Sequence, residues 1–363
     1  MDAVEREHYP ELERWLRDPT CARSLALTPY LPPTPQLVEE WVEKHAQAPA
    51  SRWLTVTRAG DEKPLGIAGY RRIDFKNRQA RAFAYLEDAA ALAGPEGREC
   101  FAILDRFARE ENDWVRVSVD EPEGSPALAA ALAAGYQVEV RLREGDLVAG
   151  RRVDRIQAAA LAFAPGAEPP HPAPVTVRPR PPAGLEGALV HLEPPRHEHA
   201  ETFKRWLNDA RVNRFIRPWG RYPMSLKDER GWIDRYHQDQ SGVGLVIVDR
   251  ATGRIIGTTG FSPNAPGAGD AVLGIGIGEP EYWGRGYGSE AFDLLTGFAF
   301  RERDLHRVTL DVYEGNPRAE RAYLKLGFRR EGVRPGEIYS TGQRIATIVM
   351  GLLRREWEAR GAT

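Results

Sequence analysis

The 363-residue sequence is poor in cysteine and has no long apolar run. Its two cysteines, Cys21 and Cys100, cannot form a disulfide framework and offer no Cys-x-x-Cys metal pair. No stretch approaches the roughly 18 consecutive apolar residues that span a bilayer, and the acidic N-terminus lacks the apolar core of a signal peptide. These absences predict a reduced, cytoplasmic protein that does not bind a membrane.

Net charge is also nearly absent, since 50 lysines and arginines oppose 52 aspartates and glutamates. General nucleic-acid binders are expected to be basic, because phosphate neutralisation dominates their affinity, so that class is disfavoured. Histidine is sparse, and we expect the close pair His197 and His199 to be a surface pair rather than a metal site. Nothing in the sequence specifies an oligomeric state.

Proline is concentrated in residues 165–184, PGAEPPHPAPVTVRPRPPAG. Proline lacks an amide donor and favours extended backbone, so this stretch is expected to be a semi-rigid linker outside either core. The chain length predicts about two domains. We therefore expect one domain at 1–164 and another at 185–363.

The two parts of the chain align with each other when 191 is subtracted from positions in the second. Two tryptophans and two glycines then coincide: Trp206 with Trp15, Trp232 with Trp41, Gly257 with Gly66, and Gly260 with Gly69. A one-residue slip also brings Gly327 onto Gly135. We interpret the two parts as a diverged tandem repeat of one fold.

Apolar periodicity predicts the secondary structure of the second part. The expected elements are strand 189–192, helix 197–209, a helix around Trp232, strands 244–249, 254–261 and 271–278, helix 289–302, strand 308–313, a helix opened by Asn316 and Pro317 and ended by Gly327, and strand 344–353. Strands that alternate with helices indicate a mixed α/β fold, with a central sheet flanked by helices in each part.

The most informative stretch is VLGIGIGEPEYWGRGYGSEAF, residues 272–292. Its strand alternates aliphatic residues with glycines, so one face is bare backbone, which a ligand or another backbone can approach closely. Three more glycines in WGRGYG precede a helix, where loop amides and the helix dipole together favour an anion. The alternative is that these glycines only form a tight turn.

This loop, WGRGYGSEA, followed by a strand and NPRAERAYLKLGF (316–328), resembles the GNAT N-acyltransferase superfamily. The resemblance covers about 187–358 and is closest to the branch of the ribosomal-protein N-terminal and polyamine acetyltransferases. It implies acetyl-CoA as cosubstrate, without a metal. It also implies a splayed central sheet, whose glycine-bearing strand separates from its neighbour to admit the pantetheine arm.

The resemblance implies a role for each matching residue. Asn316 matches a cofactor contact, Tyr323 the acid that protonates the leaving thiolate, and Asp311 a general base found in some relatives. The implied cofactor-binding residues of the strand and loop are Ile275, Gly276, Ile277, Trp283, Gly284, Arg285, Gly286, Tyr287, Gly288 and Ser289. The branch often has Gln or Arg where this chain has Trp283, and an acid where it has Val272.

Each catalytic assignment has a structural alternative. Tyr323 lies on an apolar helix face and could be a packed aromatic residue, while Asn316 could be only a helix cap. Asp311 lies between apolar neighbours in a strand, where a buried salt bridge is the rival. In the first part of the chain the corresponding residues differ: Phe83, Tyr85 and Glu87 replace the strand glycines, Pro95 replaces Gly286, Ser125 replaces Asn316, and Leu132 replaces Tyr323.

We therefore expect a catalytic C-terminal domain that transfers acetyl from acetyl-CoA to a primary amine, and a non-catalytic N-terminal relative. The alternatives are an acyl-CoA-binding scaffold without turnover and a nucleotide-binding regulator. The acceptor amine is left open, as a small molecule or a protein N-terminus. The segment 212–223 is expected to border it, where Arg214, Arg217 and Arg221 suit an acidic acceptor or form a solvated rim.

Overall fold

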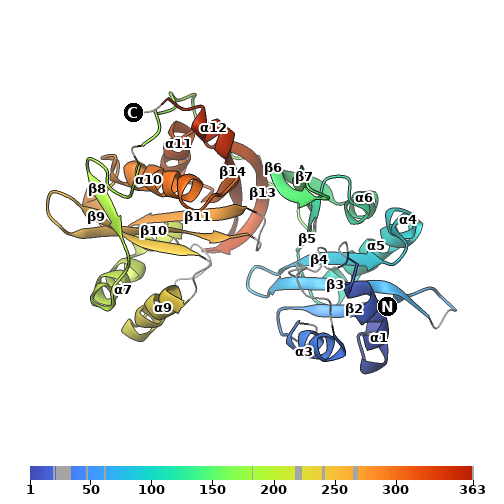
Figure 1. The fold of residues 1–363 in the computed structure, drawn as a ribbon. Helices are drawn as coiled ribbons and strands as arrows, with labels where there is room; N and C mark the ends of the chain where they lie inside the picture. Colours follow the sequence, from blue (N-terminus) through green and yellow to red (C-terminus); the bar gives the residue numbers. More distant parts are fainter. Residues whose placement is uncertain are drawn as a thin grey trace. The chain divides into compact units, whose positions relative to one another are not determined.

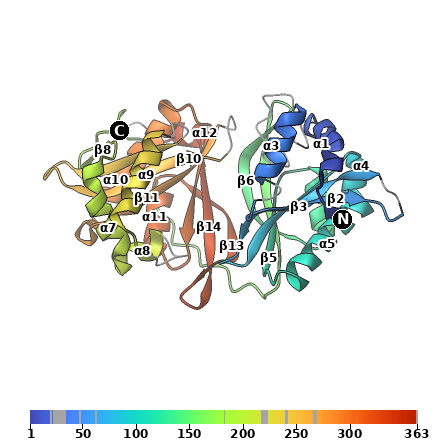
Figure 2. The same cartoon turned by 90° about the horizontal axis from the view of Figure 1, so that it is seen from below.

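The structure is a computed structural model that describes residues 1–18, 21, 34–45, 48–60, 63–181, 183–216, 223–238, 242–264 and 269–361. It divides into two compact units, an N-terminal unit (Met1–Gly166) and a C-terminal unit (Ala167–Thr363). Both are mixed α/β units in which helices flank a sheet (Figures 1 and 2). Within the described ranges, no helix is long and apolar enough to cross a membrane.

The elements of the N-terminal unit are β1 (Asp2–Ala3), η1 (Arg6–His8), α1 (Tyr9–Leu16), α3 (Pro35–His45), β2 (Arg52–Thr57), β3 (Pro64–Asp74), β4 (Gln79–Leu86), α4 (Ala89–Ala93), α5 (Pro95–Glu110), β5 (Arg116–Pro122), α6 (Pro126–Ala133), β6 (Gln137–Val148) and β7 (Arg151–Leu161). Side chains alternate across β4, so Phe83 and Tyr85 pack towards α1 and α3 while Ala82 and Ala84 pack towards α5.

The elements of the C-terminal unit are β8 (Val190–Glu193), η2 (His197–His199), α7 (Ala200–Asn208), α8 (Ala210–Ile216), α9 (Leu226–Gln238), β9 (Val243–Asp249), β10 (Ile255–Pro263), β11 (Asp270–Ile277), η3 (Pro280–Tyr282), α10 (Tyr287–Arg301), β12 (Arg307–Tyr313), α11 (Pro317–Lys325), β13 (Arg329–Ser340), β14 (Gln343–Leu353) and α12 (Arg354–Glu358). The expected elements are present. Sequence periodicity missed α8, α12 and β13, since β13 carries few apolar residues and two register shifts.

The strands of the two units follow the same order. The order is β1-β2-β3-β4-β5-β7-β6 in the N-terminal unit and β8-β9-β10-β11-β12-β14-β13 in the C-terminal unit. Neighbouring strands are antiparallel except for β4 with β5 and β11 with β12, which are parallel. The mixed α/β fold class expected from the sequence is confirmed.

The hydrogen-bonded registers also agree at the shift of 191 residues. In the parallel pairs, Gln79 lies opposite Arg116 in one unit, and Asp270 lies opposite Arg307 in the other. Pairing ends after Arg81 and Ser118 in one unit and after Val272 and Thr309 in the other, although all four strands continue further. Each parallel pair therefore opens into a gap beyond these residues.

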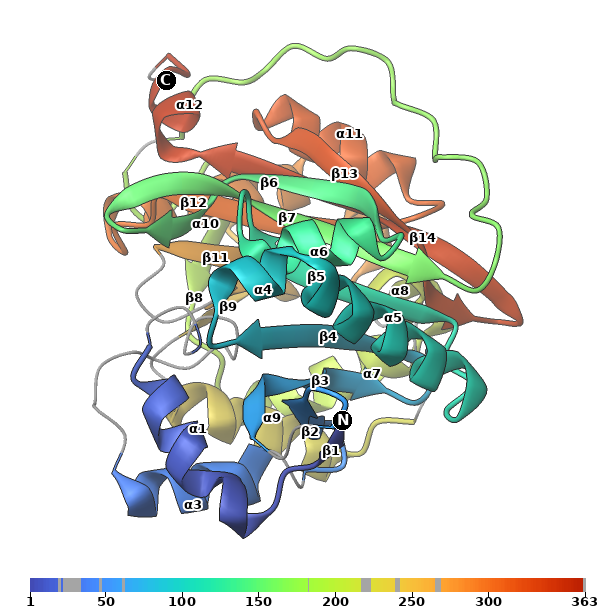
Figure 3. The same cartoon turned by 90° about the vertical axis from the view of Figure 1, so that its right-hand side faces the viewer.

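The proline-rich segment belongs to the C-terminal unit from Ala167 onward and is more than a spacer. Figure 3 shows it as an extended coil between β7 and β8. Its proline carbonyls accept hydrogen bonds from arginines of the unit: Pro169 from Arg330 at 2.8 Å, and Pro181 from Arg301 at 2.8 Å. We call described residues 167–181 the proline strap. Proline removes the amide donor but leaves the carbonyl, so arginines are suitable partners for such a segment.

Candidate active site

A cavity of about 810 Å³ lies in the C-terminal unit beside the gap between β11 and β12. Most of the residues singled out from the sequence line it: Ile275, Gly276, Ile277, Trp283, Gly284, Gly286, Gly288, Ser289, Asp311, Asn316 and Tyr323. Arg285 and Tyr287 are not among the lining residues. The Arg285 guanidinium lies over the rings of Tyr282 and Tyr287, at 5.9 and 5.7 Å from their centroids.

The glycines of β11 have different surroundings along one face of the strand. A Cβ atom on Gly274 would meet no heavy atom within 4 Å, so the backbone there borders open space. A Cβ atom on Gly276 would come within 2.7 Å of Ile216 Cδ1. Beyond the strand, a Cβ atom on Gly278 would overlap the Trp206 ring at 2.0 Å. Gly278 therefore makes room for a core tryptophan rather than for a ligand, and only part of the glycine face is open.

The amides in the first turn of α10, which follows the glycine loop, have no hydrogen-bond acceptor among the described residues. Gly286 is the N-cap residue with φ +96°, a left-handed conformation that favours glycine. The first intrahelical hydrogen bond runs from Glu290 N to Gly286 O at 3.0 Å. The amides of residues 287–289 come before it and have no acceptor within the helix. Trp283 holds the loop against the sheet by donating its indole N–H to Ile277 O at 2.9 Å. This arrangement can receive an anion at the helix N-terminus.

Asn316 is the N-cap residue of α11, and Tyr323 lies within that helix. The Asn316 side-chain oxygen accepts a hydrogen bond from Ala319 N at 3.3 Å, so the capping role is present. The Tyr323 ring packs on Phe292 and Phe328, with centroids 4.9 and 6.2 Å away. No described group hydrogen-bonds the Tyr323 hydroxyl, and burial raises the pKa of this phenol, which keeps it protonated at neutral pH. Tyr323 is therefore a packed aromatic residue that also lines the cavity.

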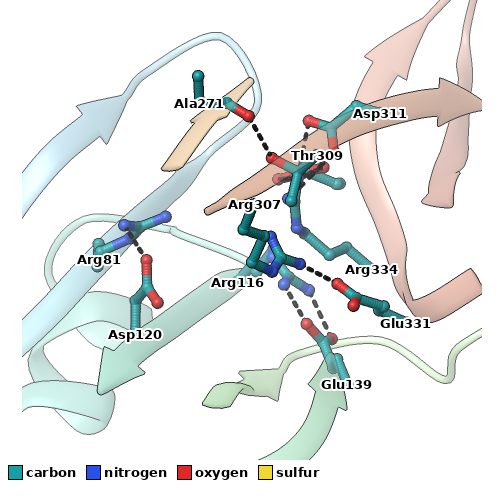
Figure 4. A network of polar contacts seen from close by, with 11 residues as sticks. Arg81, Arg116, Asp120, Glu139, Ala271, Arg307, Thr309, Asp311, Glu331 and Arg334 are labelled. Carbon is teal, nitrogen blue, oxygen red and sulfur yellow. Dashed lines mark hydrogen bonds and ion pairs between the residues drawn. The ribbon is translucent and has the colours of Figure 1, made fainter. Parts of the chain in front are cut away.

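Asp311 lies on β12 in an ion pair with Arg334, with N···O distances of 3.3 and 3.4 Å (Figure 4). Arg334 also contacts Glu337 at 3.0 Å, so one guanidinium is shared between two carboxylates. Burial raises the pKa of Asp311, and the charge of Arg334 opposes this shift. The side chain keeps 35% of its surface exposed, and it lines the cavity. Asp311 therefore forms the salt bridge that was the alternative to a catalytic role, and a ligand in the cavity can still reach its carboxylate.

Sequence inspection missed a concentration of positive charge around the cavity. Its charged lining residues within the described ranges are Arg178, Arg211, Arg318, Arg321 and Lys325, against a single acid, Asp311. Arg318, Arg321 and Lys325 of α11 recur at i, i+3 and i+7, a spacing that places them along one side of the helix. This spacing was visible in the sequence. The Arg318 guanidinium lies 4.8 Å from the centroid of the Trp283 ring, close to the glycine loop. Such a lining favours a polyanionic ligand.

The lining residues from α8 and α9 are mostly apolar or aromatic: Phe215 and Ile216 from α8, and Trp232 and Tyr236 from α9. Arg214 stacks its guanidinium 5.0 Å from the Phe215 ring centroid and is not a lining residue. Arg217 and Arg221, the other two arginines expected to suit an acidic acceptor, lie outside the described residues.

The corresponding region of the N-terminal unit is filled. Phe83 packs on Trp53 with centroids 4.8 Å apart, and Tyr85 lies 6.4 Å from Trp15. Helix α4 takes the place of the glycine loop, and Pro95 is the first residue of α5 after the N-cap Gly94. Counted from the helix start, Pro95 corresponds to Tyr287, not to Gly286 as the shift of 191 indicates. Gly94 has ψ −156°, the extended conformation that proline imposes on its predecessor, whereas Gly286 has ψ −19°.

Comparison with known proteins places the site in a family context. The family model for the acetyltransferase (GNAT) domain matches residues 190–329. An uncharacterized N-acetyltransferase, YoaA of Bacillus subtilis (strain 168), is 31% identical over 118 residues, 32% of this chain and 66% of that protein. An uncharacterized N-acetyltransferase, p20 of Bacillus licheniformis, is 30% identical over 111 residues, 31% of this chain and 62% of that protein. The chain thus spans somewhat less than two thirds of these curated relatives.

Solved structures with similarity include spermidine N-acetyltransferase from Vibrio cholerae in complex with CoA and spermine. It has 19% identity and a TM-score of 0.44, and the match covers 47% of this chain and 99% of that one. A GNAT-family acetyltransferase from Bacillus anthracis has 20% identity and a TM-score of 0.42, with 47% of this chain and 98% of that one covered.

Proposed function

Since residues 190–329 match the family model for the GNAT acetyltransferase domain, we propose that the C-terminal unit transfers an acetyl group from acetyl-CoA directly to a primary amine. The observation that carries this proposal is one cavity that combines the glycine loop, the diverging strands β11 and β12, and Tyr323. The acceptor is a small molecule or a protein N-terminus.

The residues present suit coenzyme A. The free amides at the start of α10 and the dipole of that helix would receive the pyrophosphate. Beyond Val272, β12 no longer pairs with β11, so one edge of β11 is open to the amide-containing pantetheine arm. The cationic lining offsets the negative charge of the phosphates.

The transfer forms an N–C bond and breaks the C–S bond of the thioester. The attacking amine must be neutral, and Asp311, directly or through water, would accept its proton. Backbone amides of β11 would polarise the thioester carbonyl, and Tyr323 would protonate the leaving thiolate. The raised pKa of Asp311 supports the base role, because it brings the pKa of the carboxylate closer to that of the ammonium group that it deprotonates.

The activity is tested with a panel of amines and with release of free CoA thiol as the readout. The panel contains peptides with free N-termini, polyamines, amino acids and aminoglycosides. We expect acetyl-CoA binding and amine-dependent thiol release with at least one class. A scaffold without turnover predicts CoA binding and no release with any amine. A nucleotide-binding regulator predicts tight binding of ATP in preference to CoA.

The glycine loop is tested separately by comparing Tyr287→Pro with Tyr287→Ala in acetyl-CoA binding. Both variants remove the ring, which packs against Tyr282 with centroids 4.9 Å apart. Only proline removes the amide and forces Gly286 away from its native ψ, as Pro95 does in the N-terminal unit. We expect the Tyr287→Pro variant to bind acetyl-CoA about 10- to 100-fold more weakly than the Tyr287→Ala variant, which corresponds to the loss of one or two charge-assisted hydrogen bonds. Equal affinities in two folded variants would contradict the anion-binding role of the loop.

A further inference from the structure

The proline strap is fixed beside the cofactor cavity at Arg178, a residue outside the range that matches the family. Arg178 donates its backbone N–H to Lys325 O, the last residue of α11, at 2.7 Å. Its carbonyl accepts from Arg360 Nε at 2.8 Å, and Arg360 is held in turn by Asp293 at 2.9 and 3.1 Å. The backbone of Arg178 is therefore tied on one side to α11 and on the other to a buried ion pair.

The neighbouring residues make this segment of the strap stiff. Pro179 follows Arg178 directly, and its carbonyl accepts a hydrogen bond from the Arg360 guanidinium at 2.8 Å. Proline limits the backbone conformations open to the unbound strap, so less entropy is lost when Arg178 is presented to a ligand.

The Arg178 side chain itself is exposed and lines the cavity. No described residue forms a hydrogen bond or an ion pair with its guanidinium. The acid on which its charge acts, Asp293, is already paired with Arg360. Lys325 and Arg321, which line the same cavity, likewise have no ion pair among the described residues. Unpaired charges of one sign around a cavity repel one another, and a bound anion would remove that repulsion.

These cations lie at two separate positions along α11. Arg318 is near the glycine loop, through its contact with Trp283. Lys325 is seven residues further on, about 10 Å along a helix that rises about 1.5 Å per residue, and the strap joins α11 at that end. Coenzyme A also carries phosphate in two places: the pyrophosphate and a separate ribose 3′-phosphate. The glycine loop accounts for only the first.

We propose that Arg178, with Lys325, binds the ribose 3′-phosphate of coenzyme A, so that the cofactor site is completed by the strap. This inference rests on the proposed function. A phosphate monoester carries close to two negative charges at neutral pH, and a guanidinium binds it with two parallel hydrogen bonds. A lysine ammonium adds a point charge beside it. The strap is thereby a binding element as well as a connection between the two units of the chain.

The test measures binding of CoA and of 3′-dephospho-CoA to the full-length protein by calorimetry. Wild type is expected to prefer CoA, and Arg178→Ala to lose about tenfold in CoA affinity, with dephospho-CoA affinity unchanged within about twofold. Arg178→Lys should retain part of the preference, and Lys325→Ala should reduce it. The matched control is Arg329→Ala, because Arg329 is a nearby exposed arginine that is paired with Glu356 and does not line the cavity. It should behave as wild type.

The outcomes separate the two proposals. If wild type binds CoA but Arg178→Ala weakens both ligands equally, or neither, the phosphate role of Arg178 is wrong while the proposed function stands. If Arg329→Ala lowers CoA affinity as much as Arg178→Ala, the effect is one of net charge, and the role is again wrong. If wild type binds neither ligand, both proposals fail. Unchanged thermal unfolding of Arg178→Ala would show that the strap remains docked.

Discussion

The two units keep the same framework but differ at the positions that surround a ligand. Each contains a buried arginine–glutamate pair at equivalent positions, Arg116 with Glu139 and Arg307 with Glu331 (Figure 4). In each unit a helix tryptophan also donates a hydrogen bond to a glutamate just after the fourth strand of the sheet, Trp15 to Glu87 and Trp206 to Glu279. These contacts hold strands and helices together, and they are shared whether or not a cavity is present.

The differences are concentrated where the parallel strands diverge. The α11 cations Arg318, Arg321 and Lys325 correspond at the shift of 191 to Ala127, Ala130 and Ala134 in the N-terminal unit. Asp120, the counterpart of Asp311, is paired with Arg81 at 2.6 Å, and Arg81 occupies the position of Val272. We propose that the N-terminal unit is a non-catalytic relative, in which core packing and ion pairs have replaced ligand contacts. The comparison teaches that this framework does not require its ligand site.

The largest expected effect is on catalysis, at Tyr323. Tyr323→Phe keeps the ring packing on Phe292 and removes only the hydroxyl, so stability should change little. The turnover rate should fall about 10- to 10,000-fold, because an acid typically contributes 10²–10⁴ and water substitutes in part. The Michaelis constant for acetyl-CoA should change much less.

Tyr323→Leu, which copies Leu132 of the N-terminal unit, is the companion variant. It should lose the same activity and also some stability. Steady-state kinetics and thermal unfolding check both. A rate for Tyr323→Phe within about twofold of wild type would leave Tyr323 as a packing residue only.

A second test asks whether the shared ion pairs are equivalent supports. Arg116→Met and Arg307→Met each leave a buried glutamate without its partner, which typically costs about 3–5 kcal/mol. Hydrogen exchange read by mass spectrometry should show the loss in the N-terminal unit for the first variant and in the C-terminal unit for the second. Replacing the glutamate by Met as well should recover most of the loss in each unit. If one arginine is dispensable, the two frameworks are not equivalent.

The smallest effect concerns pH, and it should be confined to the N-terminal unit. Burial raises the pKa of Glu121 from its ordinary 4.5 to about 7, with Arg71 opposing the shift. A carboxyl whose pKa is higher in the folded state binds more protons there, so stability is lost as pH rises from about 4.5 to 7. Its counterpart in the C-terminal unit is Val312, which does not titrate.

Glu121→Gln should therefore flatten this pH dependence and stabilise the N-terminal unit by about 2–3 kcal/mol at pH 8. Hydrogen exchange at several pH values measures the change, and peptides of the C-terminal unit serve as the internal control. A pH dependence in the variant equal to that of wild type would show that Glu121 is not its source.

The sequence alone determined the features that arise from short-range chemistry. Asn316 and Pro317 open α11 where their capping chemistry predicts, and the alternating glycines and aliphatic residues of 272–278 give a strand with two unlike faces. A few tryptophans and glycines indicated the shift of 191 residues, and the same shift relates the strand pairing of the two units. Backbone propensity and side-chain period act over a few residues, so they can be inferred without knowing what lies opposite.

Tertiary structure decided what each of these elements meets. Only the packing shows that Gly278 accommodates Trp206, that Asp311 faces Arg334, and that α4 replaces the glycine loop in the N-terminal unit. The same holds for the strap, since its proline content predicted an extended segment but could not indicate the arginines that bind its carbonyls. These contacts join residues separated by 23 to 161 positions, and their geometry depends on strand register and helix packing rather than on local sequence.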